Sequence, residues 1–201
     1  MPQDQVPTPK AADRILATAS ELFYREGSRG VGVDEIVARA GAPKPSLYRA
    51  FGSKDRLIAA YLETEAVRLW SFFEAAVASH PDDPRAQILA WFDAMADRLQ
   101  SRDHRGCGLS NAAVEYPDPA HPGRQVAVAH KEQVRKRLRE LTRSLDARKP
   151  KKLADSLMLL MEGALVTCQL FGGTGPAGAA RGAAEALIAA HTRGGTNAGD
   201  D

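Results

Sequence analysis

The sequence predicts an all-α protein in which a small N-terminal domain of three helices is joined by a long helix to a larger C-terminal helical domain. Apolar residues recur at helical spacing in most segments between prolines and glycines, and no segment alternates apolar and polar residues as a half-buried strand does. With 44% hydrophobic and 26% charged residues, the composition is typical of a folded rather than a disordered chain. A chain of 201 residues is long enough to bury a full core.

The first predicted helix begins at Thr8 and Pro9, because threonine caps helices and proline is tolerated at the first helical position. It continues to Gly27, where we expect it to end. A second, short helix begins after Gly32 with acidic residues in its first turn, where the helix dipole favours them, and ends at Gly41. The apolar residues of the first helix are Ile15, Leu16, Ala19, Leu22 and Phe23.

A third helix of about two turns is predicted to follow, because Pro43 and Pro45 both fit a helix start. Its core face consists of Leu47 and Phe51. After a glycine, Ser53 can cap a long fourth helix, which we expect to bridge the two domains. The predicted domains are 8–55 and 56–192, and the tails 1–7 and 193–201 are predicted to be disordered.

Prolines and glycines divide the rest of the chain into further helical segments. One of them is apolar over so wide an arc that it has to pack on two sides. The last one is rich in alanine, and small side chains allow close contact between helices. The predicted segments are an apolar helix over 88–99, a short one over 109–115, a long basic one over 134–145, the broadly apolar one over 153–168 and the alanine-rich one over 179–190.

Charge and cysteine content restrict the function classes. The net charge of +2 means that any nucleic-acid binding has to be local. Residues 1–10 lack the layout of a secretory signal, and no run of apolar residues approaches about 18, so we expect a cytoplasmic protein without membrane contact. Cys107 and Cys168 lack CxxC spacing, which indicates reduced thiols rather than a disulfide or a zinc ribbon.

Three helices near the N-terminus, the last two of them short and joined by a turn that contains glycine, are typical of a helix-turn-helix DNA-binding domain. The run from Val33 to Leu57 resembles the signature of the TetR family of transcriptional regulators almost position for position, and the resemblance extends back through Arg14-Ile15-Leu16 and Glu21-Leu22-Phe23. It implies a homodimer with a helical C-terminal domain that holds an effector pocket. It also implies repression that ends when a small molecule changes the spacing of the two DNA readers.

The polar face of the third helix supplies the candidate DNA contacts, which are Lys44, Ser46, Tyr48 and Arg49. In the resemblance, Lys44 and Tyr48 correspond to phosphate or base contacts and Lys54 to a phosphate contact. We expect Lys44, Tyr48 and Lys54 to hold the DNA backbone and Ser46 and Arg49 to read bases. The alternative is that these residues are ordinary solvated side chains.

Two positions depart from the family pattern. Gly32 and Pro43 stand where the family usually has capping hydroxyl residues, and Pro43 lacks an N–H that could donate to a phosphate. The exact list of DNA contacts is therefore open.

Aromatic and methionine residues on the C-terminal helices suit either a pocket for a small hydrophobic or amphipathic effector or a plain core. Asn111 and Glu115 could add polar contacts. The apolar residues concerned are Trp91, Phe92, Met95, Met158, Met161, Leu165 and Phe171. The candidate ligand-contacting residues are Trp91, Met95, Cys107, Asn111, Met161, Leu165 and Cys168.

Cys107 follows Arg102, His104 and Arg105 and stands between two glycines, which favours either an oxidant- or electrophile-sensing thiol or a small apolar residue under a loop. The basic helix is either a second nucleic-acid surface or, as we expect, a solvated face with local ion pairs to Glu132 and Glu140. Its basic residues are Lys131, Arg135, Lys136, Arg137, Arg139 and Arg143.

An enzyme is the main alternative class, because helical bundles can host metal or nucleophilic sites. The five histidines are scattered, however, and the sequence contains no HExxH motif, no paired Glu-x-x-His and no phosphate-binding loop. We therefore expect no enzymatic activity, no cofactor and no metal. The prediction is a transcriptional regulator, a repressor that binds a palindromic operator in double-stranded DNA as a dimer. A regulator without a small-molecule ligand is the alternative.

Overall fold

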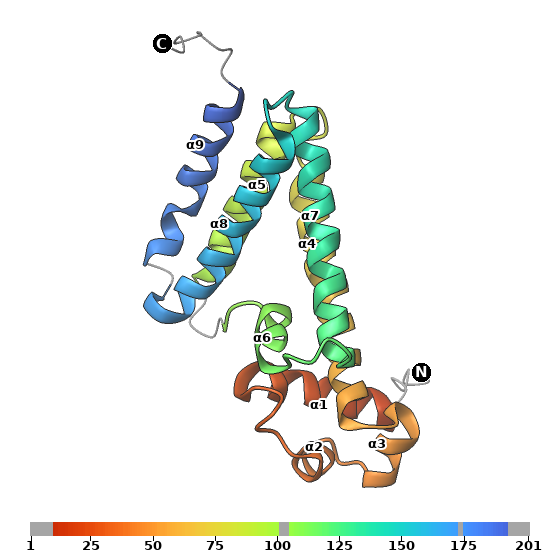
Figure 1. Ribbon diagram of the computed structural model, residues 1–201. Helices are drawn as coiled ribbons and strands as arrows, with labels where there is room; N and C mark the ends of the chain where they lie inside the picture. The colour runs from red at the N-terminus through yellow and green to blue at the C-terminus, as the bar shows by residue number, and fades with distance from the viewer. Residues whose placement is uncertain (1–9, 101–104, 173–174, 193–201) are drawn as a thin grey trace, which may run out of the picture. The chain divides into compact units, whose positions relative to one another are not determined.

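The computed structural model describes residues 10–100, 105–172 and 175–192, and every regular element in these ranges is helical (Figure 1). This confirms the predicted all-α class. The predicted tails and the predicted cap residues Thr8 and Pro9 lie outside the described residues. The first helix was predicted to begin there, but it begins at Ala11, with Lys10 as its N-cap residue. The helices are α1 (Ala11–Glu26), α2 (Val33–Arg39), α3 (Lys44–Phe51), α4 (Lys54–Ala78), α5 (Pro84–Leu99), α6 (Gly108–Glu115), α7 (Pro122–Ser144), α8 (Pro150–Phe171), the 3-10 helix η1 (Pro176–Ala179) and α9 (Ala180–Thr192).

The chain forms two compact units, which we describe separately. Unit 1 comprises Met1–Val67 and Gly108–Ala129, and unit 2 comprises Arg68–Cys107 and His130–Asp201. Helices α4 and α7 each contribute one part to unit 1 and the other part to unit 2. Helix α6 belongs to unit 1, together with the three N-terminal helices.

Local chemistry accounts for the helix ends. Ser53 caps α4, since its Oγ accepts a hydrogen bond from the Arg56 N–H at 3.1 Å. Asp83 caps α5 in the same way, through a 2.9 Å bond from the Ala86 N–H. Helix α3 ends at Gly52, which has a φ of 79° that glycine adopts without strain. The predicted end of α3 at Gly52 and the predicted cap of α4 at Ser53 are therefore confirmed.

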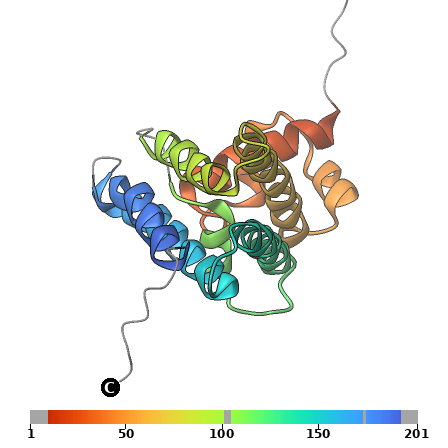
Figure 2. The ribbon, with the colours of Figure 1, turned by 90° about the horizontal axis from the view of Figure 1, so that it is seen from above.

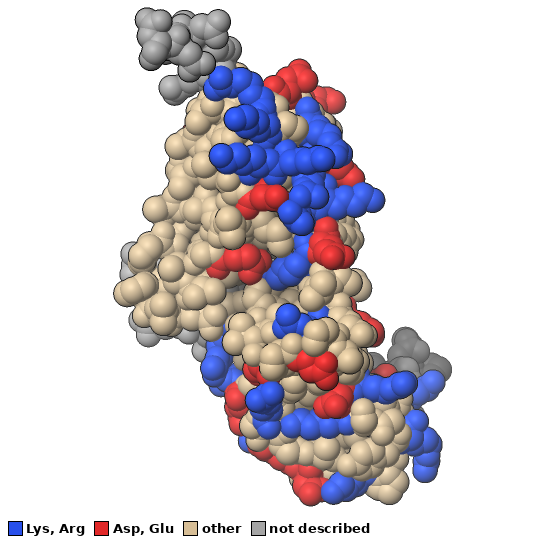
Figure 3. Space-filling view, in the orientation of Figure 1, with Lys and Arg blue, Asp and Glu red and all other residues tan. Residues whose placement is uncertain are grey.

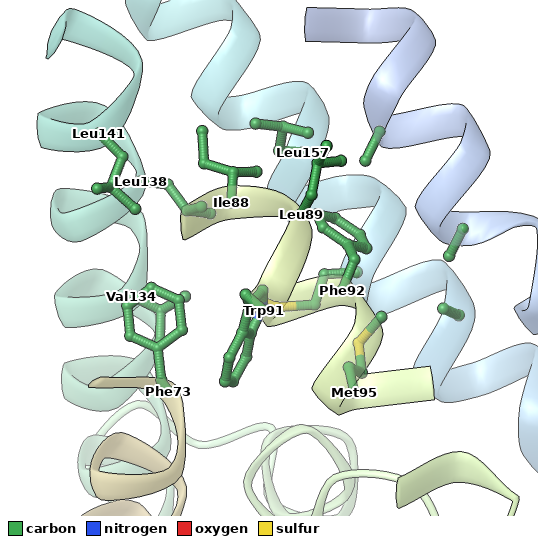
Figure 4. Packing of buried hydrophobic residues seen from close by; sticks show 14 of the residues in the cluster. Phe73, Ile88, Leu89, Trp91, Phe92, Met95, Val134, Leu138, Leu141 and Leu157 are labelled. Atoms are coloured by element: carbon green, nitrogen blue, oxygen red, sulfur yellow. Dashed lines mark hydrogen bonds between the residues drawn. The ribbon is translucent and has the colours of Figure 1, made fainter. Parts of the chain in front are cut away.

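The core of unit 2 is built from α4, α5, α7, α8 and α9 (Figure 4). The Phe73 ring meets the Trp91 ring edge to face, with centroids 4.3 Å apart, and the Trp91 indole N–H lies 2.9 Å from the Met161 sulfur. Figure 2 looks along these helices and has α4, α5, α7 and α8 around this core, with α9 beside α8. Aromatic and aliphatic burial together stabilise the unit.

Helix α8 has two apolar faces, as its sequence predicts. One face, which includes Leu153, Leu157 and Met161, is buried in the core of unit 2. The other is exposed, with Leu159 at 74% and Leu170 at 71% exposure. Although the sequence contains no long uninterrupted apolar run, the helix is long and apolar enough to cross a membrane by length and composition. One third of its most apolar window is buried within the protein.

Basic side chains gather over α7, with acidic side chains among them (Figure 3), and several of them form ion pairs with neighbouring helices. Arg135 makes a bidentate pair with Asp155 of α8, at 2.7 and 2.8 Å, and its hydrogen bonds lower the pKa of Asp155 to about 2. Arg137 pairs with Glu74 of α4 at 3.1 Å and with Glu140 of its own helix at 3.5 Å. The expected local pair to Glu140 is thus present, but most partners come from other helices.

Candidate nucleic-acid interface

The turn between α2 and α3 sets the position of the candidate recognition helix. Gly41 adopts a φ of 58°, and the Ala42 N–H donates to the Val37 carbonyl at 3.0 Å. Arg14 of α1 reaches this turn, where its Nε donates to the Ala40 carbonyl at 3.1 Å and its Nη2 to the Gly41 carbonyl at 3.0 Å. One guanidinium therefore satisfies two carbonyls at the end of α2 and ties the turn to α1.

Helix α3 begins at two prolines, as predicted. Pro43 is its N-cap residue and Pro45 its second helical residue, positions where a missing N–H breaks no helical hydrogen bond. The Leu47 side chain is fully buried and Phe51 is half-buried. These two residues fix one face of α3 against unit 1, and the remaining face is exposed.

The exposed face of α3 holds three of the five predicted DNA-contacting residues. Lys44 and Tyr48 are four residues apart on it and Arg49 follows. The Tyr48 ring is 46% exposed, which is unusual for an aromatic side chain without a partner surface. An ammonium, a phenol and a guanidinium on one helix face can grip phosphates and donate to guanine acceptors.

Ser46 and Lys54 lie differently from the other three. Ser46 is half-buried near the start of α3, and its N–H donates to the Pro43 carbonyl at 2.9 Å. The Lys54 ammonium lies at the start of α4 and donates to the Arg29 carbonyl at 3.4 Å, so it is held against the loop that follows α1. Both lie within unit 1, Ser46 near the start of α3 and Lys54 at the start of α4.

An ion pair joins α3 to α2. Lys44 Nζ lies 2.8 Å from the Asp34 carboxylate, which is itself 82% exposed. The hydrogen bond that Lys44 donates to Asp34, together with the Asp34 charge, raises the pKa of Lys44 above its ordinary value. Asp34 therefore keeps Lys44 protonated but offsets its positive charge where a phosphate would approach.

Helix α6 is linked to the loop between α1 and α2 within unit 1. Glu115, at the end of α6, accepts a 2.6 Å hydrogen bond from the Ser28 hydroxyl and a 3.2 Å bond from the Ser28 N–H. The next residue, Tyr116, lies 3.0 Å from the same hydroxyl and stacks on the His121 ring, with centroids 3.8 Å apart. Glu115, suggested by the sequence as a ligand contact, is thus bonded to the loop between α1 and α2.

The predicted ligand-contacting residues are distributed over both units. Trp91, Met95, Met161 and Cys168 are buried in the core of unit 2 and Leu165 packs against it, while Cys107 is buried in the same unit. Asn111 is half-buried on α6 in unit 1. Among the described residues, no three His, Cys, Asp or Glu side chains are grouped so that they could hold a metal ion.

Sequence reasoning missed two contributors to the interface. Arg14 appeared only as part of the family resemblance, and Asp34 only as an acidic residue in the first turn of a helix. Both act through residues 10 or more positions away in the chain, Arg14 through Ala40 and Gly41, and Asp34 through Lys44. A search for acidic residues near the recognition helix could have found Asp34, whereas nothing local marks Arg14.

The chain is similar to known regulators over about nine tenths of its length in structure, and its N-terminal part matches a family model in sequence. A sequence profile of the family described as "Bacterial regulatory proteins, tetR family" matches residues 15–61. The crystal structure of a TetR-family transcriptional regulator from Streptomyces coelicolor aligns with a TM-score of 0.86 and 32% identity, covering 91% of this chain and 96% of that one.

Two curated relatives are similar over shorter stretches. The HTH-type transcriptional activator FasR of Mycolicibacterium smegmatis is 36% identical over 93 residues, which are 45% of this chain and 42% of FasR. The HTH-type transcriptional repressor ComR of Escherichia coli is 29% identical over 114 residues, 55% of this chain and 54% of ComR. The alignment thus spans about half the length of these relatives, one an activator and the other a repressor.

Proposed function

Because this chain belongs to the TetR family of transcriptional regulators, we propose that it is a repressor that binds a palindromic operator as a dimer. The observation that carries the proposal is the exposed face of α3, where Lys44, Tyr48 and Arg49 lie together beside a turn fixed by Arg14. The family is one of DNA-binding regulators and not a class of enzymes. Binding to operator DNA places the protein in the cytoplasm.

The three side chains take different roles in this proposal. Lys44 and Tyr48 hold phosphates, since an ammonium and a phenol bind them without regard to sequence, and Lys54 adds a phosphate contact. Arg49 reads a base, because a guanidinium can donate two hydrogen bonds to the O6 and N7 of guanine. Ser46 is assigned the second base contact, at the start of the helix.

Dimerisation is supported by the free faces of α8 and α9. Leu159, Gly163, Val166 and Leu170 are all exposed and recur every three or four residues, so they form one stripe along α8. The exposed residues of α9 include Gly182, Ala183, Ala186 and Ala190, whose small side chains permit close approach of another helix. Two copies of these faces would form a four-helix interface around a twofold axis.

Release by a small hydrophobic or amphipathic effector completes the proposal. Its support is the aromatic and sulfur-rich interior of unit 2, where Trp91 meets Phe73 and Met161. Methionine and aromatic side chains adapt to apolar ligands of different shapes. A panel of such compounds, tested for their effect on thermal stability and then on operator binding, would identify the class of effector.

Selection of bound sites from random duplex DNA tests the DNA-binding part. We expect an inverted repeat. With the selected site, Lys44→Ala and Tyr48→Ala should weaken binding to all sequences alike, whereas Arg49→Ala should relax preference at one base position, where a good contact discriminates by about 1–3 kcal/mol. Recovery of random sequences without symmetry would contradict the proposal, and the reverse pattern among the variants would overturn the assigned roles.

A further inference from the structure

The two cysteines of the chain are equally buried but lie in different chemical environments. Cys107 is 7% exposed and Cys168 is 5% exposed. The Lys131 ammonium of α7 donates a 3.5 Å hydrogen bond to the Cys107 sulfur and a 2.6 Å bond to the Glu162 carboxylate of α8. All three residues belong to unit 2, so the cluster is a property of one compact unit.

The cation in this cluster is firmly held. Lys131 is only 20% exposed, and although burial lowers its pKa, the charges and hydrogen bonds of Cys107 and Glu162 outweigh burial and raise it. Lys131 therefore stays protonated beside the sulfur. An adjacent ammonium stabilises negative charge on sulfur, which is the reactive form of a cysteine.

The backbone at Gly106, directly before Cys107, packs closely against α8. Gly106 has a φ of 72°, and a Cβ atom there would lie 3.2 Å from the Leu165 carbonyl oxygen and would overlap the Gln169 side chain. Residue 106 thus has to be glycine, because the backbone at this position lies close to Leu165 and Gln169 of α8. An atom added to the Cys107 side chain cannot be accommodated by a shift of this backbone toward α8.

Cys168 provides a comparison within the same molecule. Its sulfur donates a 3.4 Å hydrogen bond to the Leu99 carbonyl, and burial raises the pKa of its thiol. The Cys168 sulfur thus faces a carbonyl oxygen, whereas the Cys107 sulfur faces an ammonium group. Because the exposures are alike, a difference in reactivity between the two cysteines would report this chemical environment.

We propose that Cys107 is an oxidation site for small hydroperoxides, activated by Lys131, and that its oxidation releases the protein from DNA. The sulfur attacks the distal peroxide oxygen, an S–O bond forms and the O–O bond breaks. The thiol proton ends on the departing oxygen, giving a sulfenic acid and water or an alcohol. Sulfur loses two electrons and the peroxide gains them.

The effect of Cys107 oxidation on DNA binding is transmitted through the segment from Cys107 to Glu115. This part of the proposal rests on the proposed function. Cys107 is followed directly by Gly108, the first residue of α6, whose last residue, Glu115, is bonded to Ser28 between α1 and α2. The oxygen added to Cys107 enters the space between the sulfur and the Lys131 ammonium. It displaces residue 107 and with it the start of α6.

The chemical part is tested on the intact protein with hydrogen peroxide as the probe. Sulfenic acid is trapped with a 1,3-dione, and the labelled peptides that contain Cys107 and Cys168 are quantified over time by mass spectrometry. We expect Cys107 to be labelled several-fold faster than Cys168, because an ammonium lies beside its sulfur and only a carbonyl beside the other. Equal rates at the two cysteines would overturn the proposal.

Variants of Lys131 separate activation from simple accessibility. Lys131→Met should slow labelling of Cys107 toward the rate at Cys168, and Lys131→Arg should largely retain the wild-type rate because it keeps the cation. In Lys131→Met the Glu162 carboxylate loses its partner, so the double variant Lys131→Met/Glu162→Gln is measured as well, and circular dichroism confirms that each variant is folded. An unchanged rate in the folded double variant would contradict a role for the ammonium.

Operator binding after peroxide treatment tests the regulatory part. We expect peroxide to release the wild-type protein and Cys168→Ser from the selected operator, whereas Cys107→Ser should stay bound. Operator binding that persists after complete oxidation of Cys107 would overturn the regulatory part. The labelling rates do not depend on DNA, so failure of the proposed function, seen as no operator binding before treatment, is distinguishable from failure of the thiol assignment.

Discussion

At the scale of single residues, the interface combines side chains that the sequence identifies with partners that it does not. Lys44, Tyr48 and Arg49 were predicted from their spacing on a short amphipathic helix, and the structure exposes all three. The ion pair from Lys44 to Asp34 depends on how α2 crosses α3. Spacing along one helix cannot reveal a contact of this kind, because it is set by the angle between two helices.

Removal of the Asp34 charge should strengthen binding to DNA. Asp34→Asn leaves the Lys44 ammonium without its 2.8 Å carboxylate partner and removes one negative charge beside α3. We expect affinity for duplex DNA to rise a few-fold at low salt, and the gain to shrink as salt increases. Fluorescence anisotropy with labelled operator and random duplexes at several salt concentrations measures both effects.

The control for this experiment is Glu35→Gln on the same helix. Glu35 pairs with Arg39 at 2.8 Å, so its removal changes the net charge by the same amount without freeing Lys44. If the affinity for duplex DNA increased equally in the two variants, the effect would come from net charge alone. The interpretation of Lys44 as a phosphate contact restrained by Asp34 would then be wrong.

At the scale of elements, helix ends are decided locally and helix faces are decided by packing. The ends of α3 and α4 follow from Gly52 and Ser53, which act on their own backbone. The basic face of α7 was predicted to be solvated with local pairs. Its partners are mainly Asp155 and Glu74 on other helices, which no pattern along α7 contains.

The same helix buries a histidine that should make stability depend on pH. His130 is 6% exposed and its Nδ1 has no hydrogen-bond partner. Burial, with the Lys131 charge, lowers its pKa from 6.5 to about 4 in spite of the Glu162 carboxylate, which raises it. As pH falls from about 6.5 toward 4, the unfolded chain binds a proton first, so the free energy of unfolding decreases by up to roughly 3 kcal/mol.

His130→Leu should remove most of this dependence, because the leucine fills similar space and binds no proton. Urea denaturation at pH 7.0, 6.0 and 5.0 measures the free energy of unfolding, and the wild-type protein should lose stability over this range while the variant loses much less. His80→Gln, at an exposed position, is the control for loss of one histidine. A wild-type stability that is constant from pH 7 to 5 would disprove the assignment.

At the scale of the whole molecule, the exposed apolar stripe on α8 indicates that another surface packs against it. Leu159 and Leu170 are each more than two thirds exposed on a helix whose opposite face is buried in unit 2. Clusters of exposed leucine are unusual on a protein without a binding partner. A second copy of the chain is the partner that the inverted-repeat operator we propose would require.

Charged substitutions in this stripe should therefore separate the copies. Leu159→Glu and Leu170→Glu should each shift the protein toward the monomer in sedimentation or light scattering, and should weaken binding to a full operator toward that of a half-site. Val114→Glu on α6 is the control, since Val114 is 83% exposed but lies outside the stripe. A wild-type protein that is already monomeric at micromolar concentration would refute the dimer proposal.

The sequence by itself determined the helical class, the end of α3, the start of α4 and the face of α3 that is exposed. These depend on capping, glycine conformation and apolar spacing, which act over a few residues. Only the tertiary structure decided which distant side chains meet: Arg14 at the turn after α2, Asp34 on Lys44, Glu115 on Ser28 and Lys131 on Cys107. Such contacts depend on how buried faces pack together, and many residues far apart in the chain fix that packing jointly.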